Sequence, residues 1–555
     1  VWPLIRLFSN ENNVYSVFFV AHIVSRVLAF LFLTVLLVKL GVTQTLSVAI
    51  SILVLAITPW LQQASSVGGH GMLLNYFTHS ELTWPFLLGC LIFRDDGRLL
   101  LSSTFAGIVF LINAFVGIWL ILILSICWAT QSARENWKLV GMQFAVFFVI
   151  SLPVGIWVFF TLAAAGTPAS FSFIQYIRAY FPKHFLIEAA SLSALINLFF
   201  MLVAGILATM HVRRGEFWRV VLLACAGIFS IGTLAPYLLD SRIIFNLHLL
   251  RIDGIIQLLS TVLVVAAAVL NLQRTVNTRQ RVPWLLVLLA VSSVDTKWEF
   301  FVITLLFLTP YIAKFLWSFK LSSPSALYIK SLGNVDRPAI EALLSVGLWL
   351  IWAVGVLFVN GLSYFRLLYL GVGGGLALIL LVGRTQKSSN YFPNIIFICL
   401  LFLSAFVGAH WRAPLFQAHK ITPHAELADL AAWMRLNGHR GIVLLSKETF
   451  GYPAFQLESR NPVWVDYKQG AAVMWYPPFY FQWMKRYKEI NALIGGEAIQ
   501  KYAYSNNISY FVLHAPSGKC PVNSRFLAKS GEFLLCLVTR STENKTSFRR
   551  TSTLN

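Results

Sequence analysis

Long apolar segments separated by short polar connections fill the first three quarters of the chain. A helix that crosses a bilayer needs roughly 20 apolar residues. Runs of about that length or longer occur at Val14–Leu40, Val42–Trp60, Leu74–Phe93, Leu99–Thr130, Leu139–Ala164, Phe185–Met210, Val220–Leu239, Ile255–Asn271, Val282–Trp317, Ile340–Val359, Phe365–Val382 and Ile395–His410. Leu99–Thr130 and Val282–Trp317 are too long for one span, so we interpret each as a helical hairpin. The pattern then predicts a polytopic α-helical membrane protein with about 14 spans.

Basic residues predict which side of the membrane each connection faces, because short cytoplasmic loops carry an excess of Lys and Arg. One set of alternate connections holds Lys39, Arg94, Arg98, Arg134, Lys138, Arg213, Arg214, Arg219, Arg274, Arg279, Arg281, Lys320, Lys330, Arg337, Arg384 and Lys387. The other set holds only Arg6, Arg178, Lys183, Arg242, Arg251 and Lys297. The first set is therefore predicted to be cytoplasmic, with both termini outside. The chain starts at Val1 without Met, and a helix before Val1 would restore a cytoplasmic start.

The composition changes near Trp411, where polar residues become frequent. We expect a transmembrane helical domain over 1–410, an extracytoplasmic α/β domain over 411–540 and a polar tail over 541–555. The expected helices are Leu427–Leu436, Phe479–Ile494 and Glu497–Ser505, and the expected strands are Gly441–Ser446, Pro462–Lys468, Ile508–His514 and Phe533–Arg540. Alternating strands and helices are typical of a layered α/β domain. Cys520 and Cys536 lie here, and in an oxidising compartment they can form a bridge; the sequence leaves the pairing open.

The composition excludes several classes of protein. Hydrophobic residues make up 58% and charged residues 12% of the 555 residues. The charged fraction is about half that of soluble globular proteins, which excludes an ordinary soluble enzyme and a disordered chain. The net charge of +21 would indicate nucleic acid in a soluble domain, but here basic cytoplasmic loops account for it. We therefore expect a multi-pass protein of the plasma membrane with no nucleic-acid partner.

No P-loop, dinucleotide fingerprint, H-E-x-x-H pair or Cys/His zinc spacing occurs, so the candidate chemistry lies in polar residues at the predicted outer face. The first group is the glycine-rich connection Gly68–Glu81, which holds His70, His79 and Glu81. These side chains are suited to acid–base work or to a divalent cation. The alternative is a capped helix start with Glu81 in its first turn. One carboxylate can serve both roles, so both interpretations stay open.

A second group lies at an outer helix boundary and comprises Asp240, Arg242, His248, Arg251 and Asp253. Arginine binds phosphate through two parallel hydrogen bonds, and a nearby carboxylate can position a cation or an acceptor hydroxyl. The alternative is an interfacial Arg–Asp pair that only anchors the helix. The sequence leaves this choice open as well.

A third group lies within the first span, where His22 and Arg26 are four residues apart and share a helix face. Ionisable residues inside a membrane are costly and are functional candidates by default. Glu11, just before this helix, is the nearest acid in the sequence. The acidic and basic residues Asp295–Glu299 in the second hairpin are better explained as a solvated turn.

The densest aromatic stretch of the C-terminal part is Trp475–Trp483, and Lys485, Arg486 and Lys488 follow it. Trp483 and Arg486 are candidates for binding a sugar by stacking or for binding a lipid phosphate. The alternative, which the pattern favours, is an interfacial aromatic belt with basic residues at headgroup level.

Several of these segments resemble the GT-C superfamily of membrane glycosyltransferases, and more narrowly a GT-C-like bacterial branch. The similar segments are Gly68–Glu81, Leu249–Asp253, Phe455, Arg460, Val465–Lys468 and Trp483–Arg486. The resemblance implies many helices, an extracytoplasmic site and a C-terminal extracytoplasmic domain. GT-C enzymes usually carry an acidic base in the first outer loop after the first helix. This chain departs from that pattern, because Glu11 is the only acid near that position and no helix precedes Val14.

The leading hypothesis is an integral membrane glycosyltransferase that moves a sugar from a polyprenyl-phosphate donor to a glycan, lipid or protein acceptor. Glu11, Glu81 and Asp253 are the candidate catalytic residues. The candidate substrate-binding residues are His70, His79, Arg242, Arg251, Trp483 and Arg486. The only candidate cofactor is a divalent cation, whose ligands the sequence does not identify. The alternatives are a transporter or flippase of lipid-linked glycans and a non-catalytic assembly protein.

Overall fold

The computed structural model describes residues 7–9, 13–62, 66–68, 72–74, 77–131, 137–164, 166–292, 299–322, 338, 340–348, 423–447, 455–515 and 518–539. The chain divides into two compact units. The first, which we call the membrane unit, comprises Val1–Trp157 and Ser172–Arg412. The second, the sheet unit, comprises Val158–Phe171 and Ala413–Asn555.

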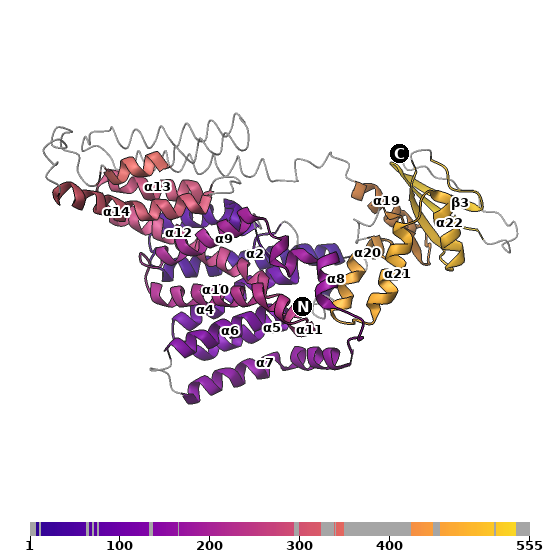
Figure 1. Ribbon diagram of the computed structural model, residues 1–555, viewed down its shortest axis with the longest axis horizontal. Helices are drawn as coiled ribbons and strands as arrows, with labels where there is room; N and C mark the ends of the chain where they lie inside the picture. Colours follow the sequence, from indigo (N-terminus) through magenta and orange to yellow (C-terminus); the bar gives the residue numbers. More distant parts are fainter. Residues whose placement is uncertain are drawn as a thin grey trace. The chain divides into compact units, whose positions relative to one another are not determined.

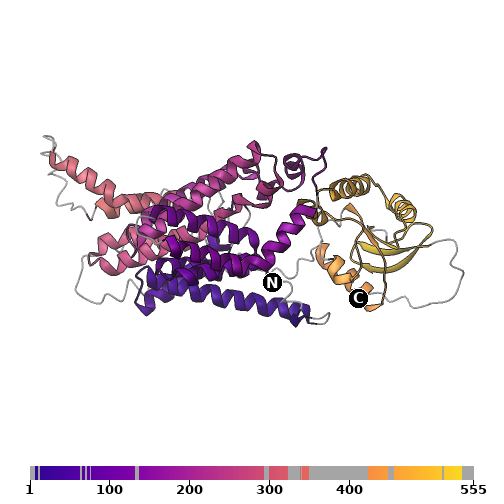
Figure 2. The same ribbon diagram turned by 90° about the horizontal axis from the view of Figure 1, so that it is seen from below.

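The membrane unit is built from helices that pack side by side (Figures 1 and 2). The longer helices are α2 (Val14–Lys39), α3 (Thr45–Ile57), α4 (His79–Asp95), α5 (Leu99–Ile112), α6 (Ala114–Gln131), α7 (Trp137–Ala164), α9 (Leu192–Ala208), α10 (Gly215–Leu238), α12 (Asp253–Arg274), α13 (Thr278–Ser292) and α14 (Glu299–Ser322). Short helical pieces connect them: η1 (Pro59–Gln62), α8 (Phe173–Tyr180), η3 (Pro182–His184), η4 (Ile187–Ala189), α11 (Arg242–Asn246) and η5 (Leu249–Ile252).

Four helical segments of the described chain are long and apolar enough to cross a membrane: Ser16–Lys39, Trp137–Thr161, Gly215–Leu238 and Arg242–Arg274. This finding confirms the expectation of a mostly helical chain with helices able to span a membrane. The number of 14 spans stays a prediction, since the predicted spans Phe365–Val382 and Ile395–His410 lie outside the described residues.

The first predicted hairpin is divided at Asn113. The backbone of Asn113 is extended and ends α5, and α6 begins at the next residue and packs against α5. In the second predicted hairpin, α13 and α14 also pack together. The turn between them, 293–298, lies outside the described residues, so Asp295 and Lys297 are not placed. Glu299 begins α14 and is buried, so the expectation of a solvated residue is wrong there.

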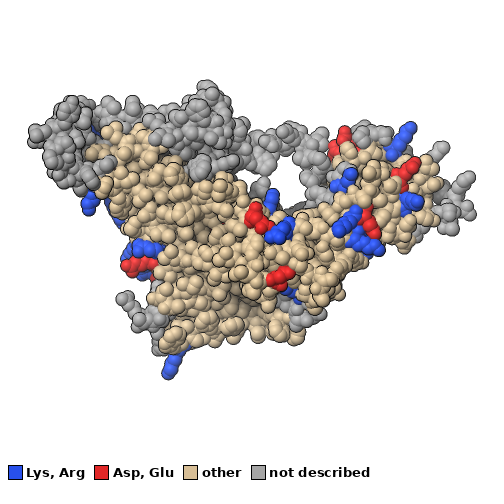
Figure 3. All heavy atoms as spheres, in the orientation of Figure 1, with Lys and Arg blue, Asp and Glu red and all other residues tan. Residues whose placement is uncertain are grey.

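The core of the membrane unit surrounds α12. All its residues from Asp253 to Leu270 are buried, and it packs against α3, α9, α10 and α13. Gly205 of α9 lies against Ser260 of α12. Because glycine has no side chain, the two helices can approach closely at this point. By contrast, α2 and α7 expose large apolar side chains such as Phe19 and Phe148. Figure 3 shows few charged side chains on the face of the helical part that is in view.

Connections that the basic-residue rule assigns to one side of the membrane lie together in the structure. Lys39 at the end of α2 is 2.8 Å from Asp96 at the end of α4. Arg214, just before α10, is 3.2 Å from the same carboxylate, and the amide of Arg213 donates to the carbonyl of Leu40. The grouping of these helix ends therefore agrees with the predicted topology. The side of the membrane that they face stays a prediction.

The sheet unit contains a four-stranded sheet in the order β1-β2-β4-β3. Its elements are α19 (Pro423–Leu436), β1 (Val443–Leu445), α20 (Phe455–Ser459), η9 (Lys468–Met474), α21 (Phe479–Asn491), α22 (Gly496–Ser505), β2 (Tyr510–His514), β3 (Ser524–Ser530) and β4 (Phe533–Val538). β1 runs parallel to β2, and the other two pairs are antiparallel. Apolar residues of α19 pack on the sheet and form a core of their own with Val443, Val512 and Leu535.

Two features of the sheet unit differ from the sequence expectation. The expected strand Pro462–Lys468 is reduced to a single parallel bridge between Val463 and Val443, and η9 follows it. The structure adds β3, which the hydrophobic pattern did not predict. The segment 158–171 also belongs to this unit by its contacts, and the ring of Phe171 lies 5.0 Å from that of Tyr480.

Cys520 and Cys536 form a disulfide with Cα atoms 6.1 Å apart, so the pairing that the sequence left open is made in the structure. The bridge joins the segment before β3 to the middle of β4. The two cysteines are 16 residues apart in the chain, and closing a loop of this size contributes about 3 kcal/mol.

The double variant Cys520→Ser with Cys536→Ser is therefore expected to destabilise the sheet unit by about 3 kcal/mol. Thermal unfolding of the purified protein, with and without a reductant, checks this. The reductant should lower the melting temperature of the wild type and leave that of the double variant unchanged. Equal sensitivity of both proteins would contradict a stabilising bridge.

Candidate functional site

The start of α4 is a capped helix terminus, as one of the two sequence interpretations expected. Thr78 precedes the helix in an extended conformation, and its hydroxyl accepts the amide hydrogen of Glu81 at 3.0 Å. Ser80 does not cap the helix. Its hydroxyl instead accepts a hydrogen bond from the side-chain amide of Asn113 at 3.0 Å. This capping places the Glu81 carboxylate in the first turn of α4, where the helix dipole favours a negative charge.

Glu81 is also the centre of a buried ionic cluster. Its side chain is 2% exposed. One carboxylate oxygen, Oε1, lies 2.6 Å from Nε of Arg26, and the other, Oε2, lies 2.8 Å from Nδ1 of His22. Besides this ion pair, Arg26 donates a hydrogen bond through Nη2 to the backbone carbonyl of Leu74. We call His22, Arg26 and Glu81 the α2–α4 cluster.

The second buried carboxylate, Asp253, begins α12 and is fully buried. Its Oδ2 accepts two backbone amide hydrogens, from Val67 at 2.6 Å and from Gly68 at 2.9 Å. The carbonyl oxygen of Gly68 in turn accepts from Nε of Arg251 at 3.4 Å and lies 3.0 Å from Nδ1 of His184. Three side chains, from the η5–α12 junction and from η3, therefore hold the backbone of Val67–Gly68.

Gly68 is required at this position because of a close backbone approach. A Cβ atom on residue 68 would lie 2.6 Å from the Cα of Arg251, and backbone at that distance cannot move aside cheaply. The short turn η5, which carries Arg251, follows His248, whose φ of 48° is left-handed. The local chain path thus brings Arg251 and Asp253 against Gly68.

The two buried groups hold the same connection, the one between η1 and α4. Asp253 and Arg251 contact it at Val67–Gly68, and Arg26 contacts it at Leu74. Three of the predicted site residues, Glu81, Arg251 and Asp253, are therefore gathered at one connection. His79 lies at the start of α4, half-buried. Glu11 and His70 lie outside the described residues.

Arg242 begins the short helix α11 and is half-buried. The nearby Asp240 caps α8, because its carboxylate accepts from the hydroxyl of Ser172 at 2.8 Å and from the amide of Ile174 at 3.0 Å. Asp240 and Asp253 thus have similar tasks, each fixing backbone amides of another segment.

Trp483 and Arg486 lie on α21 of the sheet unit. The Trp483 ring is 0% exposed, donates to the carbonyl of Asp466 at 2.9 Å and stacks on Tyr487. The Arg486 guanidinium lies 3.7 Å from the ring centre of Trp464. A fully buried ring has no free face for a sugar, so Trp483 is a core residue and not the exposed stacking surface that the sequence offered as a candidate.

Two ionisable groups near α21 have pKa values shifted by burial. Burial raises the pKa of the Tyr502 hydroxyl to about 12, and this hydroxyl donates to Glu489 Oε2 at 2.8 Å. Burial also raises the pKa of the Asp466 carboxyl, and the amides of Gln469 and Lys468 that donate to it oppose the shift. Both groups fix the connection between β1 and α21, because Tyr502 also accepts from Trp464 Nε1 and Asp466 accepts from the amide of Gln469.

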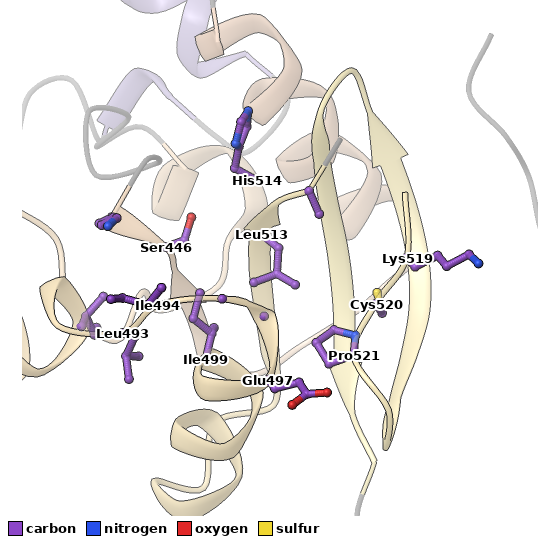
Figure 4. Close-up of a pocket in the computed structure, with 15 residues that line it drawn as sticks. Ser446, Leu493, Ile494, Glu497, Ile499, Leu513, His514, Lys519, Cys520 and Pro521 are labelled. Carbon is purple, nitrogen blue, oxygen red and sulfur yellow. The ribbon is translucent and has the colours of Figure 1, made fainter. Parts of the chain in front are cut away.

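The sheet unit also has a cavity of about 360 Å³, which the sequence did not indicate. It lies at the carboxyl ends of the parallel strands β1 and β2, where α/β folds commonly bind ligands. Its lining combines the end of β1, the end of β2, the first turn of α22 and the disulfide-linked segment: Ser446, Lys447, Ile490, Leu493, Ile494, Gly495, Gly496, Glu497, Ile499, Leu513, His514, Ala515, Lys519, Cys520 and Pro521. Figure 4 shows Ile494, Ile499 and Leu513 close together and Lys519 directed away from them.

The wall of this cavity is tightly built at Gly496. A Cβ atom there would lie 2.9 Å from the ring of Pro521 and 3.2 Å from Leu513. Because Pro521 follows the bridged Cys520, the disulfide fixes the segment that touches α22. The only sequence signal for this wall was the pair Gly495-Gly496 before a helix, which by itself is typical of a turn.

Within the described residues, no group of three or more His, Cys, Asp and Glu side chains is arranged to hold a metal ion. The divalent cation of the sequence hypothesis thus has no ligand set among them. No protein-family model, curated protein or solved structure matches the chain.

Proposed function

We propose that the protein is an integral membrane glycosyltransferase that moves a sugar from a polyprenyl-phosphate donor to an acceptor hydroxyl at the extracytoplasmic face of the plasma membrane. The observation that carries the proposal is the gathering of acidic, basic and imidazole side chains at the connection between η1 and α4. These groups come from α2, α4 and the η5–α12 junction of a unit whose other buried residues are mostly apolar. Such concentrations of ionisable groups in membrane helices mark substrate sites.

The chemistry of a lipid-linked donor matches these groups. The acceptor hydroxyl loses a proton to a base, and its oxygen forms a bond to the anomeric carbon. The bond between that carbon and the phosphate oxygen breaks, and the lipid phosphate leaves with the electron pair. A base and a cation for the leaving phosphate are the two requirements.

Arg251 is the proposed phosphate-binding residue, with Arg242 as a second candidate on the preceding short helix. A guanidinium offers parallel donors that fit phosphate oxygens. Arg251 is held beside Gly68 by its own backbone and by the hydrogen bond from its Nε, so its position is fixed before a donor binds.

Arg251→Ala is expected to raise KM for the lipid-linked donor about tenfold to 100-fold, because a charge-assisted hydrogen bond contributes about 1.5–3 kcal/mol. The assay uses the full-length protein in nanodiscs with short-chain polyprenyl phosphates that carry tritiated glucose, mannose or galactose. Arg251→Lys keeps the charge and should lose less affinity than Arg251→Ala.

Arg98→Ala is the control, since Arg98 is an exposed residue between α4 and α5, at the opposite end of α4. Unchanged donor binding and transfer in Arg251→Ala would contradict the role of Arg251. If the protein moves the labelled lipid across a proteoliposome membrane without transferring its sugar, the proposed function is wrong and the protein is a transporter.

A further inference from the structure

In the α2–α4 cluster, the residue that can accept a proton and the carboxylate that orients it are two different residues. Glu81 was one of the candidate bases, with Glu11, but its carboxylate is 2% exposed and both its oxygens already contact Arg26 and His22. A base must come within hydrogen-bond reach of the hydroxyl that it deprotonates. The His22 side chain, by contrast, is 22% exposed. The accessible proton acceptor of the cluster is therefore the imidazole.

The contact with Glu81 fixes which ring nitrogen of His22 is available. Nδ1 lies 2.8 Å from the carboxylate oxygen Oε2. An ionised carboxylate only accepts hydrogen bonds, so the neutral ring carries its proton on Nδ1. The lone pair is then on Nε2, which makes no hydrogen bond within the described part of the chain. The same division of roles operates wherever a carboxylate orients a histidine base.

Arg26 holds the carboxylate in the orientation that this requires. Its Nε contacts Oε1 of Glu81 while its Nη2 donates to the carbonyl of Leu74. The cluster is thereby fixed to the same connection that Asp253 and Arg251 hold at Val67–Gly68. His22 lies eight residues into α2, about 12 Å from its first residue along the helix axis.

We propose that His22 is the general base of the transfer and that Glu81 is its positioning residue. This inference rests on the proposed glycosyltransferase function. In the step, Nε2 of His22 takes the proton of the acceptor hydroxyl as the oxygen attacks the anomeric carbon and the lipid phosphate departs. The resulting imidazolium is stabilised by the Glu81 carboxylate and returns its proton to solvent after the product leaves.

Kinetics of His22→Ala test the base. We expect kcat to fall by about 10²–10⁴ with KM for the donor nearly unchanged, and added imidazole to restore part of the lost rate. A residue with only a structural role would not give this rescue. Wild-type kcat in His22→Ala, or a loss that imidazole does not relieve in a protein that melts normally, would overturn the assignment.

Nitrogen NMR of the ¹⁵N-histidine-labelled protein tests the positioning residue without any substrate. The wild type should show His22 protonated at Nδ1 and free at Nε2, and Glu81→Gln should lose this preference together with most of its kcat. The control is His439 of the sheet unit, whose Nδ1 lies 3.4 Å from the hydroxyl of Tyr510; His439→Ala should keep wild-type kcat. A proton on Nε2 of His22 in the wild type would overturn the inference.

The two failures can be told apart. If the wild type transfers no sugar from any of the three labelled donors, the proposed function fails, whatever the NMR shows. If the wild type transfers sugar and His22→Ala transfers it equally fast, only the assignment of His22 fails.

Discussion

Glu81→Ala is expected to lower the free energy of unfolding by about 3–5 kcal/mol, because it leaves the charge of Arg26 inside the membrane unit without its partner. Arg26 lies twelve residues into α2, about 18 Å along its axis, too far from the helix start for water to replace the carboxylate easily. Its side chain is 22% exposed, so the lower end of this range applies if the guanidinium reorients. Thermal unfolding in detergent, followed by size-exclusion chromatography, measures the loss.

Two further variants separate charge from packing. His22→Ala removes the neutral partner of Glu81 and should cost less than Glu81→Ala. The paired change Arg26→Met with Glu81→Leu removes both charges, and apolar replacement of a buried ion pair is often neutral or stabilising. The paired variant should therefore recover most of the stability. A paired variant as unstable as Glu81→Ala would show that the charge of Arg26 is not the cause.

Asp253→Ala is expected to destabilise the protein by about 2–6 kcal/mol, because two buried backbone amides, of Val67 and Gly68, lose their acceptor at about 1–3 kcal/mol each. The loss should be local at first, so the connection before α4 should become susceptible to protease at temperatures where the helices remain folded. Mass spectrometry of the cleavage products locates the cut.

Asp240→Ala is the matched comparison for Asp253. Asp240 also accepts a backbone amide of another segment, but it is exposed, and removing an exposed cap costs about 1 kcal/mol. Equal losses in the two variants would contradict the idea that burial of the amides sets the cost at Asp253.

The sequence predicts part of the α2–α4 cluster, but not which residues pair. The four-residue spacing of His22 and Arg26 places them on one helix face, and Thr78 with Glu81 has the pattern of a capped helix start. Neither pattern tells which helices meet. The sequence offered Glu11 as the acid for Arg26 because it is near in the chain, whereas the structure brings in Glu81, which lies 59 residues after His22. Helical periodicity defines a face and leaves its partner to tertiary packing.

The sheet unit shows a second limit. β3 was missed because it is an edge strand with polar residues and an irregular register between Phe526 and Ala528, so it lacks the alternation of a half-buried strand. Its partner β4 is almost entirely apolar and was predicted. The cavity beside α22 was missed for a similar reason, since it arises from segments whose proximity only the sheet order creates.

The assignment of residues 158–171 to the sheet unit has a consequence for synthesis in the cell. This segment is made more than 200 residues before the rest of its unit, which begins at Ala413. At about 5–20 residues per second, it waits on the order of 10–50 s for its packing partners. During that interval Phe171 has no Tyr480 to contact, and the nascent chain presents an apolar segment that chaperones can recognise. Expression of a fragment that starts at residue 413 would omit this segment altogether.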